Sequence, residues 1–588
     1  MNKQNSQRDQ SVEKWITIAI LAIFTYWLGV WGYALLLKPT GGTLFDAAYR
    51  CFDLFRMRYE GQGPIPWQLE VARFMAPVVT LMALGKIALS FLRDQWASFK
   101  VRRFWARHHV VIGSGEACHT LVSDIAQNGS RVVLVSDSLI DKSNDALWHK
   151  NCALLHKAVN DEAVWNAARL DHAASLIVMT NNDESNLDLI RRAKSWSQQN
   201  RRSAQGQLHA YCQFADARIR QLLRDRTDFF DPMPQFAASA FNPYQRAARI
   251  ILRAYPVEGK QSHKGSQPHI LLTGDGLMTE HLIIWIAMTG HFPNDTKTRI
   301  TLCGLNAPAV WERLCRNHPG IVELLEMNFM LEDPERLNAA NQLQPEADIA
   351  FSAAYFCDSS GAGNLIAANR CAAMLDRCDR VVVLEQYGGL ADILKPREMP
   401  DQTMLLDDAP KIFSLTTEVY TQDGILQQDL DRYASHVADQ YYRHATTEWG
   451  MQRGATAAVY PWADLSEEWR DANRTQADHI GIKLRSIDAQ EVDSAIADAS
   501  FTFTCAEIEL LAKMEHARWT AQRIMYGWTY AEQRDDKARR HPDIVGWDKL
   551  DEKTRQKDRD AVCAIPAGLR LIGRGVRRVE IAIQEIGS

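Results

Sequence analysis

Residues 108–137 contain the pattern that most constrains the fold of this chain. They read HHVVIGSGEACHTLVSDIAQNGSRVVLVSD: an apolar strand, a turn with Gly113 and Gly115, a helix, and a second apolar strand ending at Asp137. This pattern is typical of a nucleotide-binding βαβ unit, in which a glycine turn opens the helix and an acid follows the second strand. We therefore predict that a nucleotide, NAD(H) or another adenine nucleotide, binds at Gly113, Gly115 and Asp137.

Two hydrophobic segments precede this unit. Residues 15–37 form an uncharged run, and residues 67–92 form a second apolar segment that contains Pro77 and Lys86. A run of about 20 apolar residues spans the hydrocarbon core of a bilayer as a helix. Positive charge follows the second segment, as expected of a cytoplasmic flank, at Arg93, Lys100, Arg102, Arg103 and Arg107. We predict a multi-pass protein of the inner (plasma) membrane, in contact with lipid, with cytoplasmic C-terminal domains. A buried or interfacial helix is the alternative for residues 67–92.

The segment between the two spans, residues 43–61, resembles the pore helix and filter of a two-span potassium channel. It reads TLFDAAYRCFDLFRMRYEG. A potassium filter is built from rings of backbone carbonyls, and only the tyrosine and the last glycine match it here. Two arginines at this place would favour anions or close the path. The alternative is an ordinary extracytoplasmic hairpin. The residues of this pore-like loop are Arg56, Arg58, Tyr59, Glu60 and Gly61.

Strands and helices continue to alternate after Asp137, and this series resembles the TrkA-N domain, also called RCK, which regulates potassium channels and transporters. The resemblance is carried by GSGEAC at 113–118, Asp137, Asn160–Asp161 and NNDESN at 181–186. In that family the glycine turn holds the phosphates and the acid after the second strand binds ribose. The implied cofactor-binding residues are Gly113, Gly115, Asp137, Asp161, Asn182 and Asp183. Cys118 replaces the third glycine and would crowd helix–strand packing, so a Rossmann shell without ligand is the alternative.

The pattern of the first unit begins again after a linker at residues 257–268. The segment ILLTGDGLMTEHLIIWIAMTG repeats the glycine spacing, and residues 358–372 echo residues 182–196. The corresponding glycines are Gly113, Gly115 and Gly129 in the first copy and Gly274, Gly276 and Gly290 in the second. Such a repeat indicates a duplicated Rossmann-like domain. The second copy lacks an acid after its RITLCGLNA strand, so we predict an assembly or relay role for it.

Residues 503–566 are dense in tryptophan and charge, and they resemble the RyR domain first named from ryanodine receptors. The resemblance is carried by EHARW at 515–519, Gly527–Trp528, His541–Pro542 and DRD at 558–560, with an NRTQAD element at 473–478. Aromatic faces stack on a base and arginines bind phosphate, so a nucleotide-like ligand would suit such a cleft. The alternative is that the tryptophans form the core. The predicted cleft residues are His516, Arg518, Trp519, Trp528, Tyr530, Arg534 and Trp547.

The expected fold class is a membrane protein with two transmembrane helices, cytoplasmic α/β tandem Rossmann-like (RCK/TrkA-N) domains and a small, mostly α-helical RyR domain. A net charge of −5 gives no basic field for nucleic acid. Eleven cysteines without a CxxC pair or zinc spacing indicate reduced thiols, buried as small apolar residues, and no metal site. The predicted parts are 1–107, a transmembrane hairpin with a degenerate pore-like loop; 108–256, the first RCK domain; 257–268, the linker; 269–425, the second Rossmann-like domain; 426–502, a helical connector; and 503–588, the RyR domain and tail.

These resemblances imply a ligand-gated membrane channel or effector, in which nucleotide binding to the RCK or RyR domains gates an oligomeric pore with two helices per subunit. The partner chains would be copies of this chain, in a tetramer by analogy with channels, acting in stress or anti-phage signalling. One alternative is a non-conducting tethered sensor that regulates a separate transporter. A third is an NAD(P)-dependent enzyme, but no proton-donor set, nucleophile motif or metal cluster accompanies the glycine turn, so we expect no enzyme.

Overall fold

The computed structural model describes most of the chain. The described residues are 4–59, 64–137, 151–159, 162–201, 206–216, 219, 233–259, 267–336, 350–372, 375, 378–385 and 409–579. Three of the predicted site residues, Glu60, Gly61 and Asp161, lie outside them.

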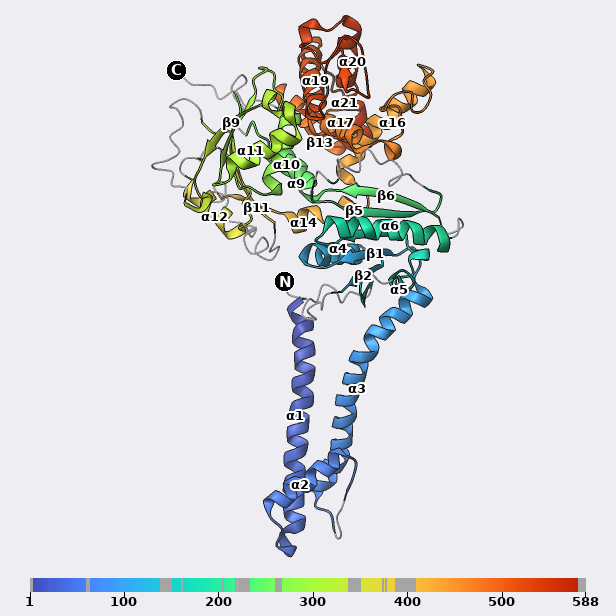
Figure 1. Ribbon diagram of the computed structural model, residues 1–588. Helices are drawn as coiled ribbons and strands as arrows, with labels where there is room; N and C mark the ends of the chain where they lie inside the picture. The colour runs from blue at the N-terminus through green and yellow to red at the C-terminus, as the bar shows by residue number, and fades with distance from the viewer. Residues whose placement is uncertain are drawn as a thin grey trace. The chain divides into compact units, whose positions relative to one another are not determined.

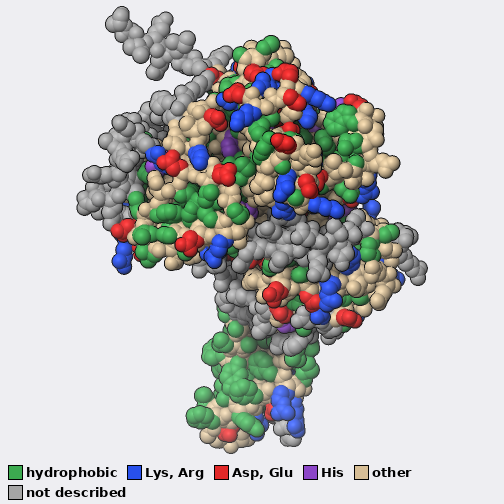
Figure 2. Space-filling view, turned by 45° about the horizontal axis from the view of Figure 1, so that its top comes forward, with side chains coloured by type: hydrophobic (Ala, Val, Ile, Leu, Met, Phe, Trp, Pro, Cys, Tyr) green, Lys and Arg blue, Asp and Glu red, His purple; other side chains and the backbone are tan. Residues whose placement is uncertain are grey.

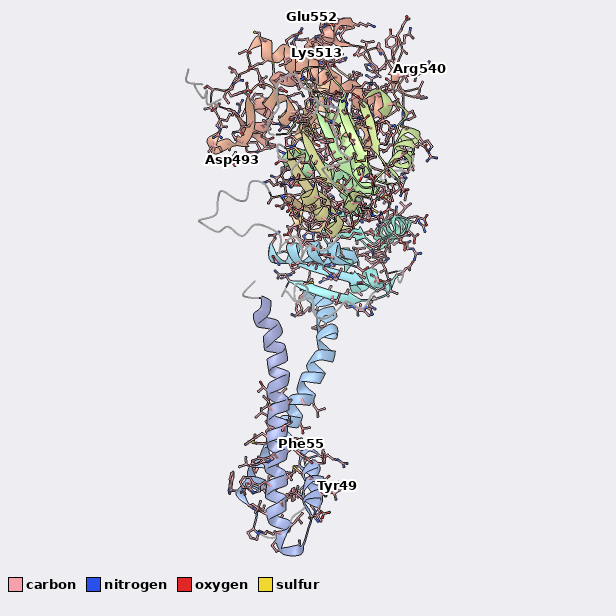
Figure 3. The ribbon with its side chains drawn as sticks, turned by 90° about the vertical axis from the view of Figure 1, so that its left-hand side faces the viewer. Tyr49, Phe55, Asp493, Lys513, Arg540 and Glu552 are labelled. Carbon is pink, nitrogen blue, oxygen red and sulfur yellow. The ribbon has the colours of Figure 1, made fainter. Side chains whose placement is uncertain are left out.

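Three helices form the N-terminal hairpin (Figure 1). They are α1 (Gln4–Leu37), α2 (Leu44–Phe55) and α3 (Trp67–Phe104), with the short 3-10 helix η1 (Lys38–Thr40) after α1. A Cβ at Gly32 on α1 would lie 2.6 Å from the backbone nitrogen of Leu69 on α3, so the glycine allows the two helices to approach closely. Tyr49 and Phe55, labelled in Figure 3, lie on α2.

Two stretches of these helices are long and apolar enough to cross a membrane. They are Thr17–Thr40, with a mean hydropathy of 1.8, and Trp67–Gly85, with 1.2. The prediction of two apolar helices of spanning length is therefore confirmed. Large apolar side chains remain exposed on both helices, among them Ile23, Phe24, Trp27, Phe74, Val78 and Leu81. Figure 2 shows apolar side chains gathered over the hairpin. Helix α3 continues through Pro77 and extends beyond the predicted segment, to Phe104.

The first Rossmann-like sheet has six strands in the order β3-β2-β1-β4-β5-β6. The strands are β1 (His109–Gly113), β2 (Val132–Ser136), β3 (Cys152–His156), β4 (Ser175–Met179), β5 (Leu208–Gln213) and β6 (Phe236–Phe241). The pairs β1–β2, β2–β3 and β5–β6 are parallel, and all residues of β2 and β4 are buried, as in a sheet covered on both faces. The helices are α4 (Glu116–Gln127), α5 (Ala163–Ala167), η3 (Leu170–His172), α6 (Asp183–Asn200) and α9 (Pro243–Ala254).

The second sheet has the strand order β12-β11-β10-β7-β8-β9, and all its pairs are parallel. Its strands are β7 (His269–Thr273), β8 (Thr298–Cys303), β9 (Leu325–Met330), β10 (Ala353–Phe356), β11 (Asp379–Leu384) and β12 (Lys411–Ser414). Counted from the first strand of each sheet, both orders are 3-2-1-4-5-6, so the predicted duplication is confirmed. The helices are α10 (Leu277–Thr289), α11 (Ala307–Asn317), η5 (Pro319–Glu323), η6 (Pro334–Arg336), α12 (Gly361–Arg370) and α14 (Leu415–Val419).

The duplication extends to a single side chain, an asparagine after the fourth strand of each sheet. Asn186 accepts hydrogen bonds from the backbone N–H and hydroxyl of Thr180 and donates to the Thr180 and Gln213 carbonyls. Asn364 likewise accepts from the Asp358 backbone N–H and donates to the Asp358 and Val383 carbonyls. Both are fully buried, and each holds the end of its fourth strand to the fifth. This shared bracing explains why the two segments echo each other in sequence.

The C-terminal part is mostly helical and has one core. Its elements are α15 (Gln422–Ile425), η7 (Asp429–Asp431), α16 (Arg432–Thr447), η8 (Trp462–Asp464), α17 (Glu467–Asp478), α18 (Ile480–Ser486), β13 (Ala489–Asp493), η9 (Ser494–Ile496), α19 (Cys505–Met525), β14 (Thr529–Tyr530), β15 (Arg540–His541), η10 (Trp547–Lys549), α20 (Glu552–Cys563), α21 (Ile565–Leu571) and β16 (Arg574–Arg578). Strand β13 pairs antiparallel with β16. Tyr433 and Leu484, which precede the RyR-like segment, pack in the same core as Leu511 and Val562. The helices before residue 503 therefore belong to the same folded part as those after it.

Candidate ligand-binding sites

The predicted glycine turn lies between β1 and α4. Gly115 has φ +92°, a conformation that side-chain-bearing residues rarely adopt, and a Cβ there would meet no atom within 4 Å. The backbone angle, not crowding, therefore requires this glycine. The turn leads directly into α4, whose first backbone N–H groups lack helical partners and can bind phosphate. Asp137 is exposed directly after β2, where ribose recognition would require it.

Two other predicted cofactor residues are engaged in local structure. The Asn182 side chain accepts a hydrogen bond from the Ser185 backbone N–H at 2.7 Å, at the start of α6. The Asp183 carboxylate accepts from the backbone N–H groups of Ala215 and Asp216 at 3.1 and 2.9 Å. These contacts give both side chains a structural role in the loops that follow β4 and β5.

The start of the pore-like loop forms a helix end rather than a strip of free carbonyls. A capping box made by Thr43 and Asp46 begins α2. At the other end the Asp53 carbonyl accepts from the Arg58 N–H at 2.8 Å, and the Leu54 carbonyl accepts from the Met57 N–H at 3.1 Å. The next carbonyl accepts too, since the Thr80 hydroxyl donates to Phe55 at 3.1 Å.

These contacts place the loop's charges at the surface. Met57 has φ +60°, which turns the chain back at this point. The Arg56 side chain is 82% exposed. A carbonyl filter requires carbonyls that face the ion path, and the three that precede this loop already have partners within the hairpin.

A cavity of about 510 Å³ lies among α16, α17, α19 and α20. Five of the seven predicted cleft residues line it, namely His516, Arg518, Trp519, Trp528 and Arg534, whereas Tyr530 and Trp547 do not. The structure therefore brings most of the predicted set to one place. The remaining wall comes from residues before 503, among them Tyr441, Trp449 and Trp469.

Arg518, predicted to hold phosphate, is committed to the fold. It is 2% exposed and forms an ion pair with Glu515 at 2.8 Å, and its Nη1 donates to the Thr475 hydroxyl, also at 2.8 Å. Lys483 is a second cation on Glu515. Burial alone would raise the pKa of Glu515, but Arg518 and Lys483 together lower it to about 2. The charge of Arg518 is thus balanced within the protein.

His516 is also held by neighbours. Its Nε2 lies 2.9 Å from the Val545 carbonyl oxygen and its Nδ1 lies 3.3 Å from the Asp558 carboxylate. Burial by itself would lower the pKa of His516, but the hydrogen bonds to Asp558 and Val545 outweigh it and the pKa is raised. The ring also stacks on Trp519, with the centroids 5.8 Å apart. His516 therefore orients Trp519 in the cavity wall.

Sequence reasoning missed Arg523, which lines the same cavity. Its guanidinium lies over three tryptophan rings, at 4.0 Å from the centroid of Trp469, 5.3 Å from Trp528 and 5.5 Å from Trp519. One signal could have found it: Arg523 is four positions after Trp519 and so shares its helix face. No local signal indicates Trp469, because it comes from α17.

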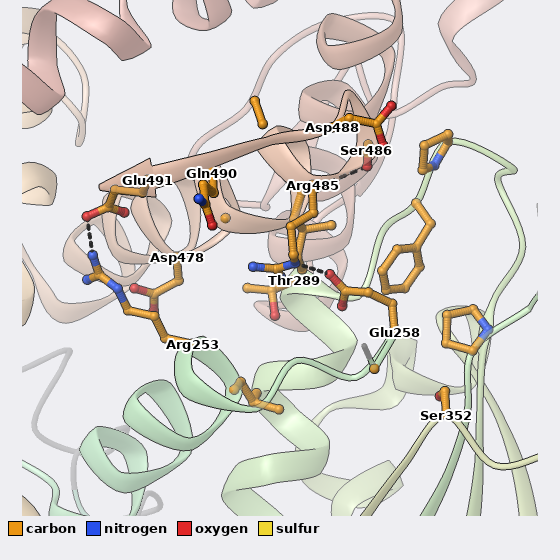
Figure 4. Close-up of a pocket in the computed structure, with 18 of the residues that line it drawn as sticks. Arg253, Glu258, Thr289, Ser352, Asp478, Arg485, Ser486, Asp488, Gln490 and Glu491 are labelled. Atoms are coloured by element: carbon orange, nitrogen blue, oxygen red, sulfur yellow. Dashed lines mark hydrogen bonds and ion pairs between the residues drawn. The ribbon is translucent and has the colours of Figure 1, made fainter. Parts of the chain in front are cut away.

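A second cavity, of about 710 Å³, is shown in Figure 4. Each arginine that lines it has a carboxylate partner. The pairs are Arg249–Asp478, Arg253–Glu491, Arg485–Glu258 and Arg574–Glu491, with N–O distances between 2.6 and 2.9 Å. An anionic ligand would have to displace these carboxylates, so this cavity is the weaker candidate.

The NRTQAD element is the centre of a buried ion-pair network. Arg474 is 7% exposed and contacts Asp431 and Asp471, each at 2.8 Å. Asp478, at the end of the element, accepts from Arg249 on α9 at 2.7 Å and from the Trp285 indole on α10 at 3.0 Å. The element thus ties the helical part that carries the cavity to helices of the Rossmann-like region.

Comparisons with known proteins match two segments of the chain to domain families. The TrkA-N domain model matches residues 109–215, and the RyR domain model matches residues 503–576. Among solved structures, the chain is similar to GsuK bound to ADP (11% identity, 70% of this chain and 96% of that chain, TM-score 0.31) and to the GsuK channel bound to NAD (10%, 72% and 86%, TM-score 0.32). It is also similar to the GsuK RCK domain (12%, 57% and 80%, TM-score 0.36). The chain therefore carries a TrkA-N domain over residues 109–215 and a RyR domain over residues 503–576.

Proposed function

We propose that this chain is a subunit of a ligand-gated membrane channel or effector. Residues 15–37 and 67–92 would cross the plasma membrane, and the remaining domains would lie in the cytoplasm. A nucleotide, NAD(H) or another adenine nucleotide, would bind at Gly113, Gly115 and Asp137, and a second ligand would bind in the cavity among α16, α17, α19 and α20. Several copies of the chain would together enclose an ion-conducting pore, and analogy with channels suggests four copies. A role in stress or anti-phage signalling follows from the same resemblance.

The continuity of α3 with the first sheet carries this proposal. Helix α3 runs unbroken from Trp67 to Phe104, and β1 begins at His109. Within this connection Val101 and His108 are fully buried and Trp105 is 7% exposed. A membrane helix that leads directly into a buried connection moves with the domain that follows it.

Hydrogen bonds fix the same connection to η3 and the residues before it. The Trp105 carbonyl accepts from the Arg169 guanidinium at 2.8 Å, and the Arg107 backbone N–H donates to the His172 carbonyl at 2.8 Å. His108 Nε2 lies 2.8 Å from the Ala168 carbonyl. Burial lowers the pKa of His108 to about 4, so the ring is neutral at physiological pH. A displacement of β1 would therefore be transmitted to α3, because the connection between them is buried and hydrogen-bonded rather than a flexible linker.

The proposed gating follows from linkage. A nucleotide at the glycine turn shifts the equilibrium between the open and closed conformations of the channel only to the extent that it binds one of them more tightly than the other. Moving a two-state equilibrium from 1:99 to 99:1 requires about a 10⁴-fold preference. Equal binding to both states would produce no response, however tight the binding.

The tethered-sensor alternative is favoured by one observation, the hydrogen-bonded carbonyls of Asp53, Leu54 and Phe55 next to the exposed Arg56. In that version the hairpin anchors the domains beside a separate transporter and conducts nothing. In both versions the chain binds its nucleotide without turnover, and we propose no enzymatic activity.

Ion flux through proteoliposomes that contain the full chain tests the proposal. Adenine nucleotides, dinucleotides and cyclic nucleotides are added on the outside of vesicles loaded with a K⁺- or Cl⁻-sensitive dye, and protein orientation is determined in parallel. Flux that one compound switches, and that Asp137→Ala weakens, supports the channel. Calorimetric binding without flux of either ion supports the tethered sensor. Consumption of NAD(P)H by the purified protein would contradict both.

A further inference from the structure

We propose that the cavity among α16, α17, α19 and α20 binds an organic phosphate with an aromatic ring, of about the size of a nucleotide, and that Arg523 holds its phosphate. This inference rests on the proposed function only in treating the cavity as a ligand site. Whether the hairpin conducts ions does not enter the argument.

Arg523 is a buried cation with little compensation. It is 4% exposed, and among the described residues its side chain donates no hydrogen bond and its Nη1 is unpartnered. The Glu468 carboxylate is 4.0 Å from Nη1, and the oxygen concerned already accepts from the Trp528 indole at 2.7 Å. A buried charge without a hydrogen-bonded partner is costly. An anion that enters the cavity would supply the missing partner.

The charge of Arg523 persists despite its burial. Burial lowers the pKa of Arg523 to about 10 although Glu468 opposes this, so the guanidinium remains protonated at neutral pH. Guanidinium groups bind phosphate through two parallel N–H···O bonds, which gives geometric specificity as well as strength.

Three other basic side chains that line the cavity have acidic partners. Arg518 is paired with Glu515 and His516 with Asp558. Arg534 is paired with Asp536 at 2.7 Å. Lys557 also lines the cavity but is exposed, so Arg523 is the buried cation of the lining that lacks a hydrogen-bonded partner among the described residues.

Aromatic rings form the inner wall beside Arg523. Trp469 and Trp528 meet edge to face at 6.4 Å, and His541 meets Trp519 in the same way at 5.1 Å. Ring faces in such a wall accept a stacked aromatic group, with a contribution of about 1–3 kcal/mol per base. A phosphate at Arg523 would therefore carry its ring along this wall.

Two further aromatic side chains stand at the cavity mouth. Tyr441 and Trp449 are 40% and 56% exposed, and their rings meet edge to face at 5.6 Å. Together with Trp469 they come from residues before the segment 503–576 that the RyR domain model matches. The site is thus composite: α16, the turn after it and α17 complete a cavity that the matched segment forms only in part. Its volume of about 510 Å³ is in the range of small-molecule sites.

Calorimetry on the full chain in detergent tests this inference. The probes are AMP, GMP, CMP and UMP, the four matching nucleosides, and inorganic phosphate. All titrations use an Asp137→Ala background, which reduces binding at the first domain. We expect at least one nucleotide to bind about tenfold or more tightly than its nucleoside and than inorganic phosphate, because each of these lacks one of the two recognised groups.

Two variants locate the binding. Arg523→Met, which keeps an apolar stem in the buried position, is expected to raise the Kd of that nucleotide about tenfold or more. Trp449→Ala changes an exposed side chain and should raise it about fivefold without affecting the fold. The matched control is Arg555→Met: Arg555 also lies over a tryptophan, 5.7 Å from the Trp547 ring, but outside the cavity. This variant should bind as the parent does.

Three results would overturn the inference. The first is no saturable binding of any of the four nucleotides. The second is nucleotide binding that Arg523→Met and Trp449→Ala leave unchanged. The third is inorganic phosphate or a nucleoside that binds as tightly as the nucleotide. Binding that follows the expected pattern without any ion flux would leave this inference intact and contradict the channel proposal, so the two failures are distinguishable.

Discussion

Arg474 shows how much a single buried side chain can hold in this fold. It contacts Asp431 before α16 and Glu467 and Asp471 on α17, and its own side chain is 9% exposed. Removal of Arg474 takes one counter-charge from the buried Asp431 and Asp471, although Asp431 keeps Arg249, and breaking a buried pair costs more than the pair itself contributes.

We predict that Arg474→Met lowers the free energy of unfolding by about 3–5 kcal/mol. The control is Arg453→Met, which removes an ion pair with Asp464 whose arginine is 56% exposed and should cost less than about 1 kcal/mol. Denaturant titration of the full chain in detergent, followed by tryptophan fluorescence, measures both. An equal loss of unfolding free energy in the two variants would contradict the stabilising role of the Arg474 network.

Asp431 in this network and Glu515 in its own ion pairs predict an acid limit to stability. Burial alone would raise the pKa of Asp431, but Arg474 and Arg249 lower it. Arg518 and Lys483 likewise lower the pKa of Glu515, to about 2. A carboxylate with a depressed pKa binds fewer protons when folded than when unfolded. Its stabilisation is therefore complete above the unfolded values of 3.8 and 4.5 and is lost as pH falls through the folded values.

We accordingly expect the thermal unfolding midpoint to decrease as the pH falls from 4.5 to about 2. Between pH 5 and 7 these two groups should not change the midpoint. Thermal melts in matched buffers measure it, with Asp431→Asn as the variant that should reduce the slope. A midpoint independent of pH over the acid range would contradict this assignment.

At the scale of elements, the turns after β1 and β7 show how the two Rossmann-like copies differ. Gly274 has φ +106°, and a Cβ there would lie 2.7 Å from the Cys357 carbonyl oxygen. Gly115 also has positive φ but faces open space. The counterpart of Gly115 in the second copy is Gly276, which has φ −87° and also faces open space, so the first copy needs a left-handed residue at this position and the second does not.

We predict that Gly274→Ala destabilises the protein by about 2–4 kcal/mol, from backbone strain and from the close contact. Gly276→Ala should cost little, because Gly276 has φ −87° and nothing lies within 4 Å of a Cβ there. Yield and thermal midpoint of the two variants provide the comparison. A stable Gly274→Ala protein would show that the turn relaxes at little cost.

The sequence predicted the elements better than it predicted their contacts. Apolar strands, glycine spacing and repeated segments were sufficient for both sheets because these signals are local. The length of α3 was underestimated because the residues after the apolar span are charged, and charge does not end a helix. Two cysteines expected to be buried, Cys505 and Cys563, are exposed at helix ends.

The candidate cavity was predicted in part for the same reason. Helical spacing places Trp519 in the cavity, but it does not show that Arg518, one position away, faces Glu515 and Thr475. The same helical spacing could also have placed Arg523 in the cavity, because it is four positions after Trp519. Trp469 and Trp449 were not, since only the folding of α16 and α17 against α19 brings them there.

At the scale of the whole molecule, the proposed gating requires that ligand binding in the folded domains changes the conformation of the hairpin. The buried connection at residues 101–109 is the part that would transmit it. A flexible insertion at this place should leave both the hairpin and the sheet folded, because each has its own core, and should remove only the coupling between them.

The most direct measurement is ligand-dependent ion flux and ligand Kd, in parallel, for the wild type and for a variant with Gly-Gly-Ser-Gly-Gly-Ser inserted between Ala106 and Arg107. The control carries the same insertion within residues 260–266, in the linker region between the two Rossmann-like domains. We predict that the ligand that changes flux in the wild type binds the junction variant with the same Kd and no longer changes its flux, while the control responds as the wild type does. A junction variant whose flux still follows the ligand would contradict the account.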